Sequence, residues 1–343
     1  MSSATTAYAP KLQTSFTQKR IDVTFHIPSG AIAPGSDADT VKLTGHRVRA
    51  TVTMAGFIAG SQLSLRIEGM TLAMMNRLSV VQAMINVQNQ ISIRGSTASV
   101  TVQAGDDTFG LSTIFQGTIA EAFVDFSGVP NVAFQVLAWD NQAAKLSPTT
   151  PTSYAGTVPA ATIFSDLASR APSAWPANDP TRPSGVFNNH SVTETVTNFY
   201  GCGTIATQID HLARTIGAAY AWDVDGALNV WSKGDSTDPN RITTKINKST
   251  GLIGYPAYNQ NGVAFTCLFN PTLRYRVPIR LESEYLPQGW VDNQMGQAIP
   301  KLPATGVWSP YTITHDVASE TPGGPWFSYV AAVTGVVPQA STT

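Results

Sequence analysis

Cys202 is the side chain in this sequence with the clearest potential to act as a nucleophile. It stands in Gly201-Cys202-Gly203, directly before a predicted helix, and a helix N-terminus lowers the pKa of a nearby thiol. A cysteine nucleophile also needs a base within hydrogen-bond distance. His190 and His211 are near in sequence, but His211 falls two turns into the helix, away from its start. We therefore expect Cys202 to be a small buried residue in a tight strand-to-helix turn.

The run Asp223-Val224-Asp225-Gly226 has some features of a calcium-binding loop. Such a loop needs a series of oxygen ligands, glycine at its sixth position and glutamate at its twelfth. Here the glycine is fourth and no ligand series follows. Asp-Gly is instead the dipeptide that a two-residue type I′ hairpin requires, so we predict a hairpin.

Histidines and carboxylates offer two further kinds of chemistry. His315-Asp316, with Asp125 or Glu121, has the residue types of an acid–base pair, which must converge in a pocket to act. Three histidines fall on predicted strands among polar neighbours, where we expect surface or interface positions: His26, His46 and His315. No His/Cys cluster has zinc spacing, and no phosphate loop or dinucleotide fingerprint is present. We predict no catalytic, cofactor-binding or metal-binding residue.

Large aromatic side chains in the predicted hairpins either line a glycan site or pack in cores and interfaces. Their alternation along strands favours packing. The aromatic residues concerned are Trp222, Trp231, Trp308, Trp326 and Phe327. We expect Trp222, Trp231, Trp326 and Phe327 to be core anchors.

The composition limits the classes of protein to consider. The chain has 343 residues, which suggests two or three domains, and 43% of them are hydrophobic. Charged residues make up 13%, about half of the ~25% typical of soluble proteins. Obligate interfaces are depleted in charge, so the composition favours a subunit of a permanent assembly. A net charge of −1 excludes a broad basic surface for nucleic acid.

Targeting and redox signals are sparse. The N-terminal residues lack the pattern of a secretory signal, and no window approaches 18 uninterrupted apolar residues, so we expect no membrane insertion. The two cysteines, Cys202 and Cys267, lie far apart, which favours folding in a reducing cytoplasm.

The chain is predicted to form three parts. Residues 1–147 alternate apolar and polar residues at 21–27, 48–54 and 63–68, with a helix at about 71–83 and a hairpin at 115–139. This pattern predicts a small antiparallel β-barrel with one short helix.

Residues 148–250 form the second part. It begins with a linker, because seven of the chain's 22 prolines fall between 148 and 183. A short helix is expected at 160–169. An α/β region follows, with an amphipathic helix at 204–216 and a hairpin at 219–231.

Residues 251–343 are predicted to form a second barrel and a C-terminal tail. Turn signals occur at Asn261-Gly262 and at Pro322–Pro325. Like the first part, this part ends in two strands around a proline-bearing turn, a weak internal echo. The fold class is therefore mainly β with some α: two tube-like β-barrels flanking a central α/β region.

Several segments in this order resemble the baseplate hub family of Mu-like contractile-tailed phages. They are RIDVTFHI (20–27), FQGTIAEAFVDFSGVPNVAFQVLA (115–138), IATQIDHLARTIGAAYAWDVDGALNVW (205–231), GLIGYPAYNQNGVAFTCLFNP (251–271), VPIRLES (277–283) and ITHDVASETPGGPWFSYVAA (313–332). The resemblance implies a homotrimeric ring with two tube-like barrels in each subunit. Three copies then present six barrels, so one ring fits a six-fold tail tube on one side and a three-fold spike on the other.

This resemblance also implies a set of partners and a place. The partners are the central spike protein, the tail tube or its initiator, and baseplate wedge proteins. Phage DNA passes through the lumen without sequence-specific binding. The location is the virion tail, after synthesis in the host cytoplasm. Some hubs carry fused lysozyme domains, for which this chain has no extra length, so we expect no enzyme. The alternatives are another tail structural protein (tube-initiating or distal) or a tail-associated cell-wall hydrolase acting through paired carboxylates.

Overall fold

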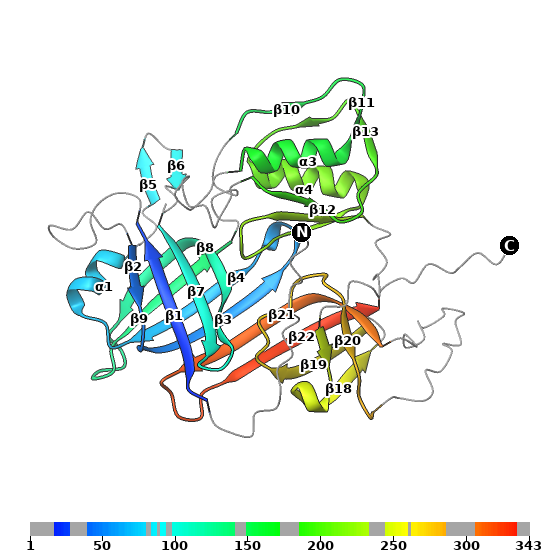
Figure 1. The fold of residues 1–343 in the computed structure, drawn as a ribbon. Helices are drawn as coiled ribbons and strands as arrows, with labels where there is room; N and C mark the ends of the chain where they lie inside the picture. Colours follow the sequence, from blue (N-terminus) through cyan, green and yellow to red (C-terminus); the bar gives the residue numbers. More distant parts are fainter. Residues whose placement is uncertain are drawn as a thin grey trace. The chain divides into compact units, whose positions relative to one another are not determined.

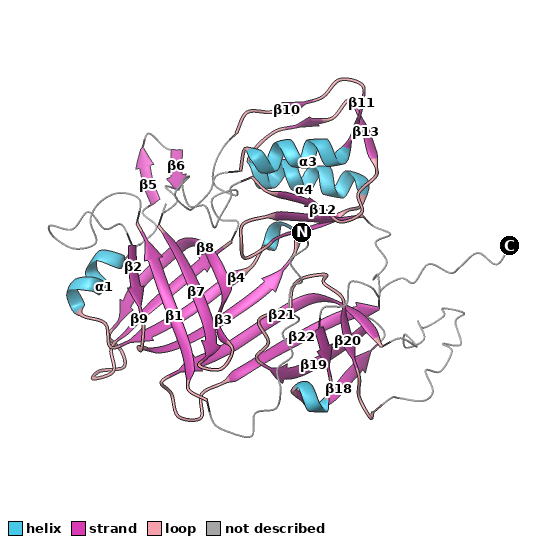
Figure 2. Ribbon diagram, in the orientation of Figure 1, coloured by secondary structure: helices cyan, strands magenta, loops and turns pink. Residues whose placement is uncertain are grey.

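The chain is mainly β, with antiparallel sheets and a few helices, as Figure 2 shows, which confirms the predicted fold class. The computed structural model describes residues 17–27, 40–79, 84–87, 90–93, 98–140, 149–171, 185–232, 244–259, 262–285 and 306–334. Two compact units share the chain. The N-terminal unit comprises Thr17–Lys233 and Val317–Pro325, and the C-terminal unit includes Gly234–Asp316 and Trp326–Thr343.

A long antiparallel sheet forms most of the N-terminal unit. Its strands run in the order β3-β4-β9-β8-β7-β1-β2 (Figure 1). They are β1 (Lys19–His26), β2 (Thr40–Leu43), β3 (Arg47–Ala55), β4 (Gln62–Glu68), β7 (Ser99–Asp106), β8 (Gly110–Asp125) and β9 (Ala133–Trp139). A separate pair joins β5 (Met84–Val87) to β6 (Gln90–Ile93), and η1 (Phe57–Ala59) and helix α1 (Leu72–Leu78) interrupt the strands.

Alternation of apolar residues builds the core of this sheet. On β3, Val48, Ala50 and Val52 are buried while the residues between them are not. The ring of Phe25 on β1 meets the ring of Phe134 on β9 edge-on, with centroids 6.2 Å apart. Strands β1 and β9 are separated by β7 and β8 in the strand order, so the sheet coils until its inner face packs on itself.

An α/β layer follows within the same unit. Helices α3 (Ala160–Ser169) and α4 (Ile205–Ile216) pack on short strands (Figure 1). Thr204 caps α4 by accepting a hydrogen bond from the Thr207 amide, and Gly217 ends it in the left-handed conformation that glycine adopts at low cost. The strands are β10 (Thr152–Ser153), β11 (Thr157–Pro159), β12 (Phe187–Asn189), β13 (Thr195–Thr197), β14 (Tyr200–Gly201), β15 (Ala219–Trp222) and β16 (Leu228–Trp231).

The C-terminal unit is a mixed sheet. Strands β18, β19, β22 and β21 are neighbours in that order, β20 pairs with β21, and β17 lies parallel to β20. Their bounds are β17 (Thr244–Ile246), β18 (Leu252–Asn259), β19 (Gly262–Leu268), β20 (Ile279–Leu281), β21 (Val307–Ser319) and β22 (Trp326–Thr334). The short helix η3 (Lys248–Thr250) links β17 to β18.

The predicted elements compare closely with those observed. Helix α3 has the predicted bounds, and α4 differs from its prediction only at Thr204, the cap. Helix α1 is shorter than the predicted 71–83, because the backbone of Ser79 is already extended. Residues 172–184 of the predicted linker and Asn261 of the predicted turn lie outside the described residues. The three-part division and the closure of two barrels stay predictions.

No helix among the described residues is both long and apolar enough to span a bilayer.

Candidate interaction surface

Cys202 is exposed in the turn between β14 and α4, which contradicts the predicted burial. The turn is tight as expected, with Gly203 at a φ of 96°. Neither neighbouring histidine is engaged with it: His190 contacts Asn229 at 2.7 Å, and the His211 ring lies 5.8 Å from that of Phe199.

Asp223 and Asp225 lie in a hairpin connection between β15 and β16, as predicted, but the turn type was wrong. The connection spans residues 223–227 and is closed by a hydrogen bond from the Asp223 amide to the Ala227 carbonyl, 2.9 Å. Only Gly226 has a positive φ, 83°, so this is not a type I′ turn. The Asp225 carboxylate accepts a hydrogen bond from the Ala227 amide at 3.0 Å and stabilises the turn itself.

His315 is completely buried in the C-terminal unit, so the predicted surface or interface position was wrong. Its Nδ1 lies 2.8 Å from Ser328 Oγ, and its ring meets Phe269 edge-on at 5.3 Å. Burial, with a smaller contribution from the positive charge of Arg274, lowers the pKa of His315 to about 3. A neutral histidine held this way is a packing residue of the β21–β22 pair.

The two cysteines differ sharply in accessibility. Cys202 is exposed, whereas Cys267 is buried on the inner face of β19, where burial raises its thiol pKa to about 12. We expect maleimide to modify only Cys202 in the native protein and both thiols in denaturant, because the thiolate is the reacting form. Mass spectrometry checks this, with Cys202→Ser as the control that removes native labelling. Native modification of Cys267 would contradict the described packing.

The five aromatic residues considered in the sequence analysis divide into a buried and a half-buried group. Trp231 and Trp308 are buried, whereas Trp222, Trp326 and Phe327 are half-buried. Trp231 stacks on His190 with centroids 4.9 Å apart, and Trp326 packs against Phe269 at 5.1 Å. The core-anchor prediction therefore holds fully for Trp231 alone. No described group of three or more His, Cys, Asp or Glu residues has a metal-binding arrangement.

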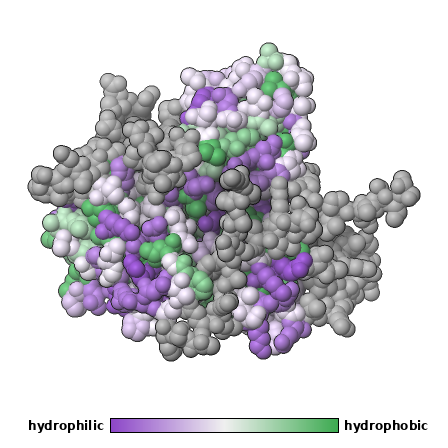
Figure 3. Space-filling model, in the orientation of Figure 1, coloured by the Kyte–Doolittle hydropathy of each residue, from purple (hydrophilic) through white to green (hydrophobic). Residues whose placement is uncertain are grey.

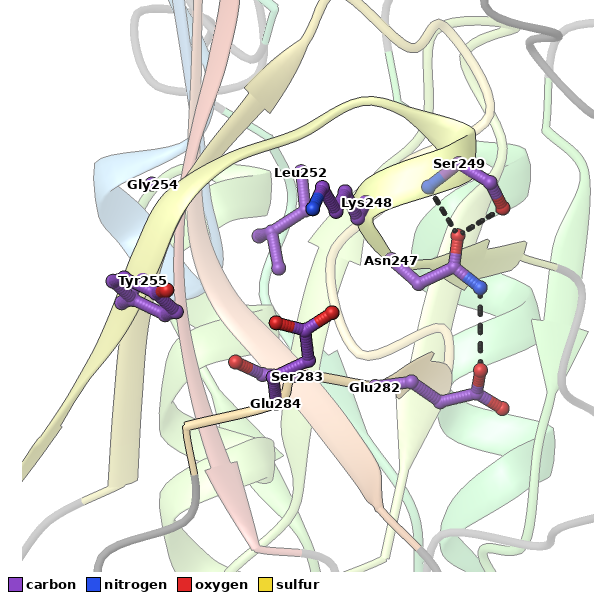
Figure 4. Close-up of a pocket in the computed structure, with 9 residues that line it drawn as sticks. All are labelled: Asn247, Lys248, Ser249, Leu252, Gly254, Tyr255, Glu282, Ser283 and Glu284. Carbon is purple, nitrogen blue, oxygen red and sulfur yellow. Dashed lines mark hydrogen bonds between the residues drawn. The ribbon is translucent and has the colours of Figure 1, made fainter.

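A hollow of about 640 Å³ lies in the C-terminal unit beside η3, where Figure 4 shows its lining. The lining residues are Asn247, Lys248, Ser249, Leu252, Gly254, Tyr255, Glu282, Ser283 and Glu284. Asn247 organises the polar side: its Oδ1 accepts hydrogen bonds from the Ser249 and Thr250 amides at 3.0 Å, and its Nδ2 donates to Glu282 at 3.2 Å.

Glu282 and Glu284 are the paired carboxylates at this hollow, so they test the hydrolase alternative. A glycoside hydrolase needs one carboxyl with a raised pKa as general acid. Hydrogen bonds from Lys245 and Asn247 instead lower the pKa of Glu282, and Lys245 Nζ lies 2.8 Å from its Oε2. Glu282 is therefore an ionised partner of Lys245, unsuited to donate a proton.

The outer side of β18, β19 and β22 carries no charged side chain, whereas the neighbouring strand β21 contains the half-buried Asp316. Strands β18, β19 and β22 contain no Asp, Glu, Lys or Arg. Their registers place Ile253, Thr266 and Tyr329 in one row, with Leu268 opposite Phe327 on one side and Ala264 opposite Ala331 on the other. We call this surface the charge-free face; it comprises Ile253, Ala257, Ala264, Thr266, Leu268, Phe327, Tyr329, Ala331 and Val333. Tyr329 is 43% exposed and Ile253 40% exposed.

The outward face of β3, β4, β9 and β8 in the N-terminal unit provides a contrast within the same chain. Its register brings charges together in cross-strand rows, and ion pairs join Arg47 to Glu68 at 3.3 Å and Arg66 to Asp125 at 3.5 Å. Hydrogen bonds from Ser127 and Gln135 lower the pKa of Asp125. Figure 3 shows hydrophilic side chains over much of the visible part of this unit. The absence of charged residues is thus a local property of β18, β19 and β22, in addition to the low charge of the whole chain.

The sequence analysis did not predict the charge-free face. Its signal was present, because residues 252–268 and 326–334 contain no Asp, Glu, Lys or Arg. The pairing of β19 with β22 joins segments about 60 residues apart, and only their register shows which side chains share the outer face.

Comparisons with known proteins place this fold among tail proteins. A family profile described as Baseplate hub gp41 matches residues 20–289. No curated protein sequence matches the chain. The tail protein of Neisseria meningitidis MC58 aligns with a TM-score of 0.53 at 8% identity, over 92% of this chain and 96% of that one.

Two further structures align with most of this chain at low identity. A chain of the Francisella PdpA-VgrG complex aligns with a TM-score of 0.50 at 9% identity, over 98% of this chain and 55% of its own length. The 43 kDa tail protein of prophage MuSo2 from Shewanella oneidensis aligns at 0.49 and 8% identity, over 91% of this chain and 96% of that one. At these identities the Neisseria and Francisella structures show the fold alone. The family match covers most of the chain, and the chain therefore belongs to the Baseplate hub gp41 family.

Proposed function

We propose that this chain is a non-enzymatic hub subunit that forms a homotrimer and joins the six-fold tail tube to the three-fold central spike of a contractile tail. Membership of the Baseplate hub gp41 family supports the hub role and a place in the virion tail. The charge-free face is the observation in the structure that carries the assembly, because an isolated soluble subunit rarely leaves a contiguous apolar surface uncovered.

Symmetry supports the choice of three copies. A junction between six-fold and three-fold parts needs a subunit that presents two similar elements inside a trimer. The chain contains two hairpins with proline-bearing turns, β8–β9 near the end of its first predicted part and β21–β22 near the end of its last. The proposed partners are the central spike, the tail tube or its initiator, and the wedge proteins. Phage DNA would pass through the lumen of the ring, and the net charge of −1 fits passage without binding.

The mass of the purified full chain in solution tests this proposal. We expect light scattering after size exclusion to give three times the subunit mass of 36.4 kDa. In tail particles we expect three copies per baseplate by quantitative mass spectrometry. Six copies would assign the chain to the tube-initiating or distal class instead. A monomer that never joins a spike would contradict the hub proposal.

A further inference from the structure

Strand β18 is irregular where it borders the hollow beside η3. Its register with β19 shifts between Ile253 and Ala257, and Gly254 has a φ of 68°, which glycine adopts without strain. Pro256 restricts the residue before it, Tyr255, to an extended backbone. Irregularities of this kind often redirect a side chain beside a functional site. Here the redirected side chain is Tyr255, which lines the hollow and is 70% exposed.

A row of aromatic rings holds Tyr255 in place. Its ring meets that of Tyr285 edge-on, with centroids 5.9 Å apart. Tyr285 packs against Tyr258 at 6.3 Å, and Tyr258 packs against the buried Trp308 at 6.0 Å. Aromatic pairs at these separations stabilise each other beyond the area that they bury. The row therefore ties an exposed ring to the core of the C-terminal unit, and a ring held in this way loses little entropy when a ligand stacks on it.

Carboxylates in defined positions line the rest of the hollow. Figure 4 shows Tyr255 at one end and Asn247 with Glu282 at the other. Asn247 Nδ2 donates to Glu282 at 3.2 Å and Lys245 Nζ lies 2.8 Å from it, so this carboxylate is held from two sides. Glu284 is exposed, and its carboxylate forms no ion pair with any residue that the structure describes. The hollow thus combines one fixed aromatic ring with hydrogen-bond acceptors.

A saccharide has the chemistry that matches this combination. A sugar ring has a face of C–H bonds, which stacks on an aromatic face, and an edge of hydroxyls, which donate to carboxylates. A wholly apolar ligand would leave Glu282 and Glu284 desolvated without a hydrogen-bond donor, which is costly. An extended peptide needs a regular strand edge, which the shifted register and Pro256 deny to β18.

We infer that the hollow beside η3 binds a short saccharide. Tyr255 provides the stacking face, and Glu282 and Glu284 accept hydrogen bonds from the sugar hydroxyls. Because Glu282 is an ionised partner of Lys245, it binds without acting as a general acid, so the saccharide stays intact. This binding site goes beyond the proposed hub function and does not depend on the homotrimer, since every residue named belongs to one unit of one chain.

Titration of the full chain with two neutral trisaccharides, followed by saturation-transfer NMR, tests the inference. Chitotriose carries acetamido groups and maltotriose carries only hydroxyls. We expect saturable binding of at least one, with the strongest transfer to its C–H protons. Tyr255→Ala is expected to raise the dissociation constant about 10-fold, because it removes the stacking face. Tyr311→Ala is the matched control, since Tyr311 is 45% exposed on β21 of the same unit and does not line the hollow.

Each outcome has a defined meaning. Weaker binding to a folded Tyr255→Ala, with unchanged binding to Tyr311→Ala, supports the inference, and circular dichroism shows that both variants are folded. Binding of neither trisaccharide to the wild type overturns it, as does binding that Tyr255→Ala leaves unchanged or that Tyr311→Ala weakens equally. Shortened saccharides after long incubation would overturn binding without hydrolysis. The mass measurement tests the homotrimer separately, so either proposal can fail while the other stands.

Discussion

Replacing Phe134 with alanine is expected to lower the free energy of unfolding by about 3–5 kcal/mol. Phe134 is fully buried on β9, between Ile67 of β4 and Val124 of β8 in the strand register. Its ring also meets Phe25 of β1, so the truncation opens a cavity where the coiled sheet packs on itself. Urea titration followed by circular dichroism measures the change.

Phe126 provides the control for this substitution. It follows β8 in the same unit and is 56% exposed, so Phe126→Ala removes the same atoms without opening a cavity. We expect it to change stability by less than about 0.5 kcal/mol. Equal effects of the two substitutions would contradict the described core.

Mild acid is expected to destabilise the protein through His315. The folded state holds this histidine neutral because burial lowers its pKa to about 3, whereas the unfolded chain takes up a proton below about pH 6.5. The contribution of neutral His315 to stability is therefore fully present above pH 6.5 and is lost progressively as the pH falls toward 3. At pH 5 the loss attributable to His315 is about 2 kcal/mol.

The measurement compares urea titrations at pH 7.5 and pH 5. His315→Gln removes the titrating group, so the fall in stability between the two pH values is expected to shrink by about 2 kcal/mol, whatever the variant's stability at pH 7.5. Phe126→Ala, which changes an exposed side chain without a titratable group, is expected to keep the wild-type fall. An undiminished fall in His315→Gln would show that another group causes it.

Local patterns predicted the local elements well. The stripe of Ile205, Ile209 and Leu212 with Thr204 and Gly217 at its ends defines α4, because a helix and its caps are determined by neighbours in sequence. Period-2 alternation located β1, β3 and β4 to within a few residues for the same reason. The hairpin around Asp225 was also predicted, although the wider loop needs the Asp223 and Ala227 backbone contact that no dipeptide signal contains.

Burial and shared surfaces were harder to predict from the sequence, since both depend on residues that are far apart along the chain. The burial of His315 depends on Ser328 and Phe269, which lie on β22 and after β19. Cys202 was expected to be buried because cysteine usually is, but whether a turn residue is covered depends on the packing of distant segments, and this one is exposed. The charge-free face required the register of three strands, and the sequence contains only their composition.

The β21–β22 hairpin has a consequence for how the protein forms during synthesis. Its tip, Val317–Pro325, belongs to the N-terminal unit, where Ser319 Oγ donates to the His46 carbonyl at 3.2 Å and Arg47 Nε donates to Thr321 Oγ1 at 3.2 Å. A nascent chain therefore cannot complete its first unit until residue 325 has left the ribosome, after most of the second unit has been made. No single cleavage of the chain releases either unit whole. A fragment that ends at residue 233 would lack Val317–Pro325 and the hydrogen bonds that this segment makes to His46 and Arg47.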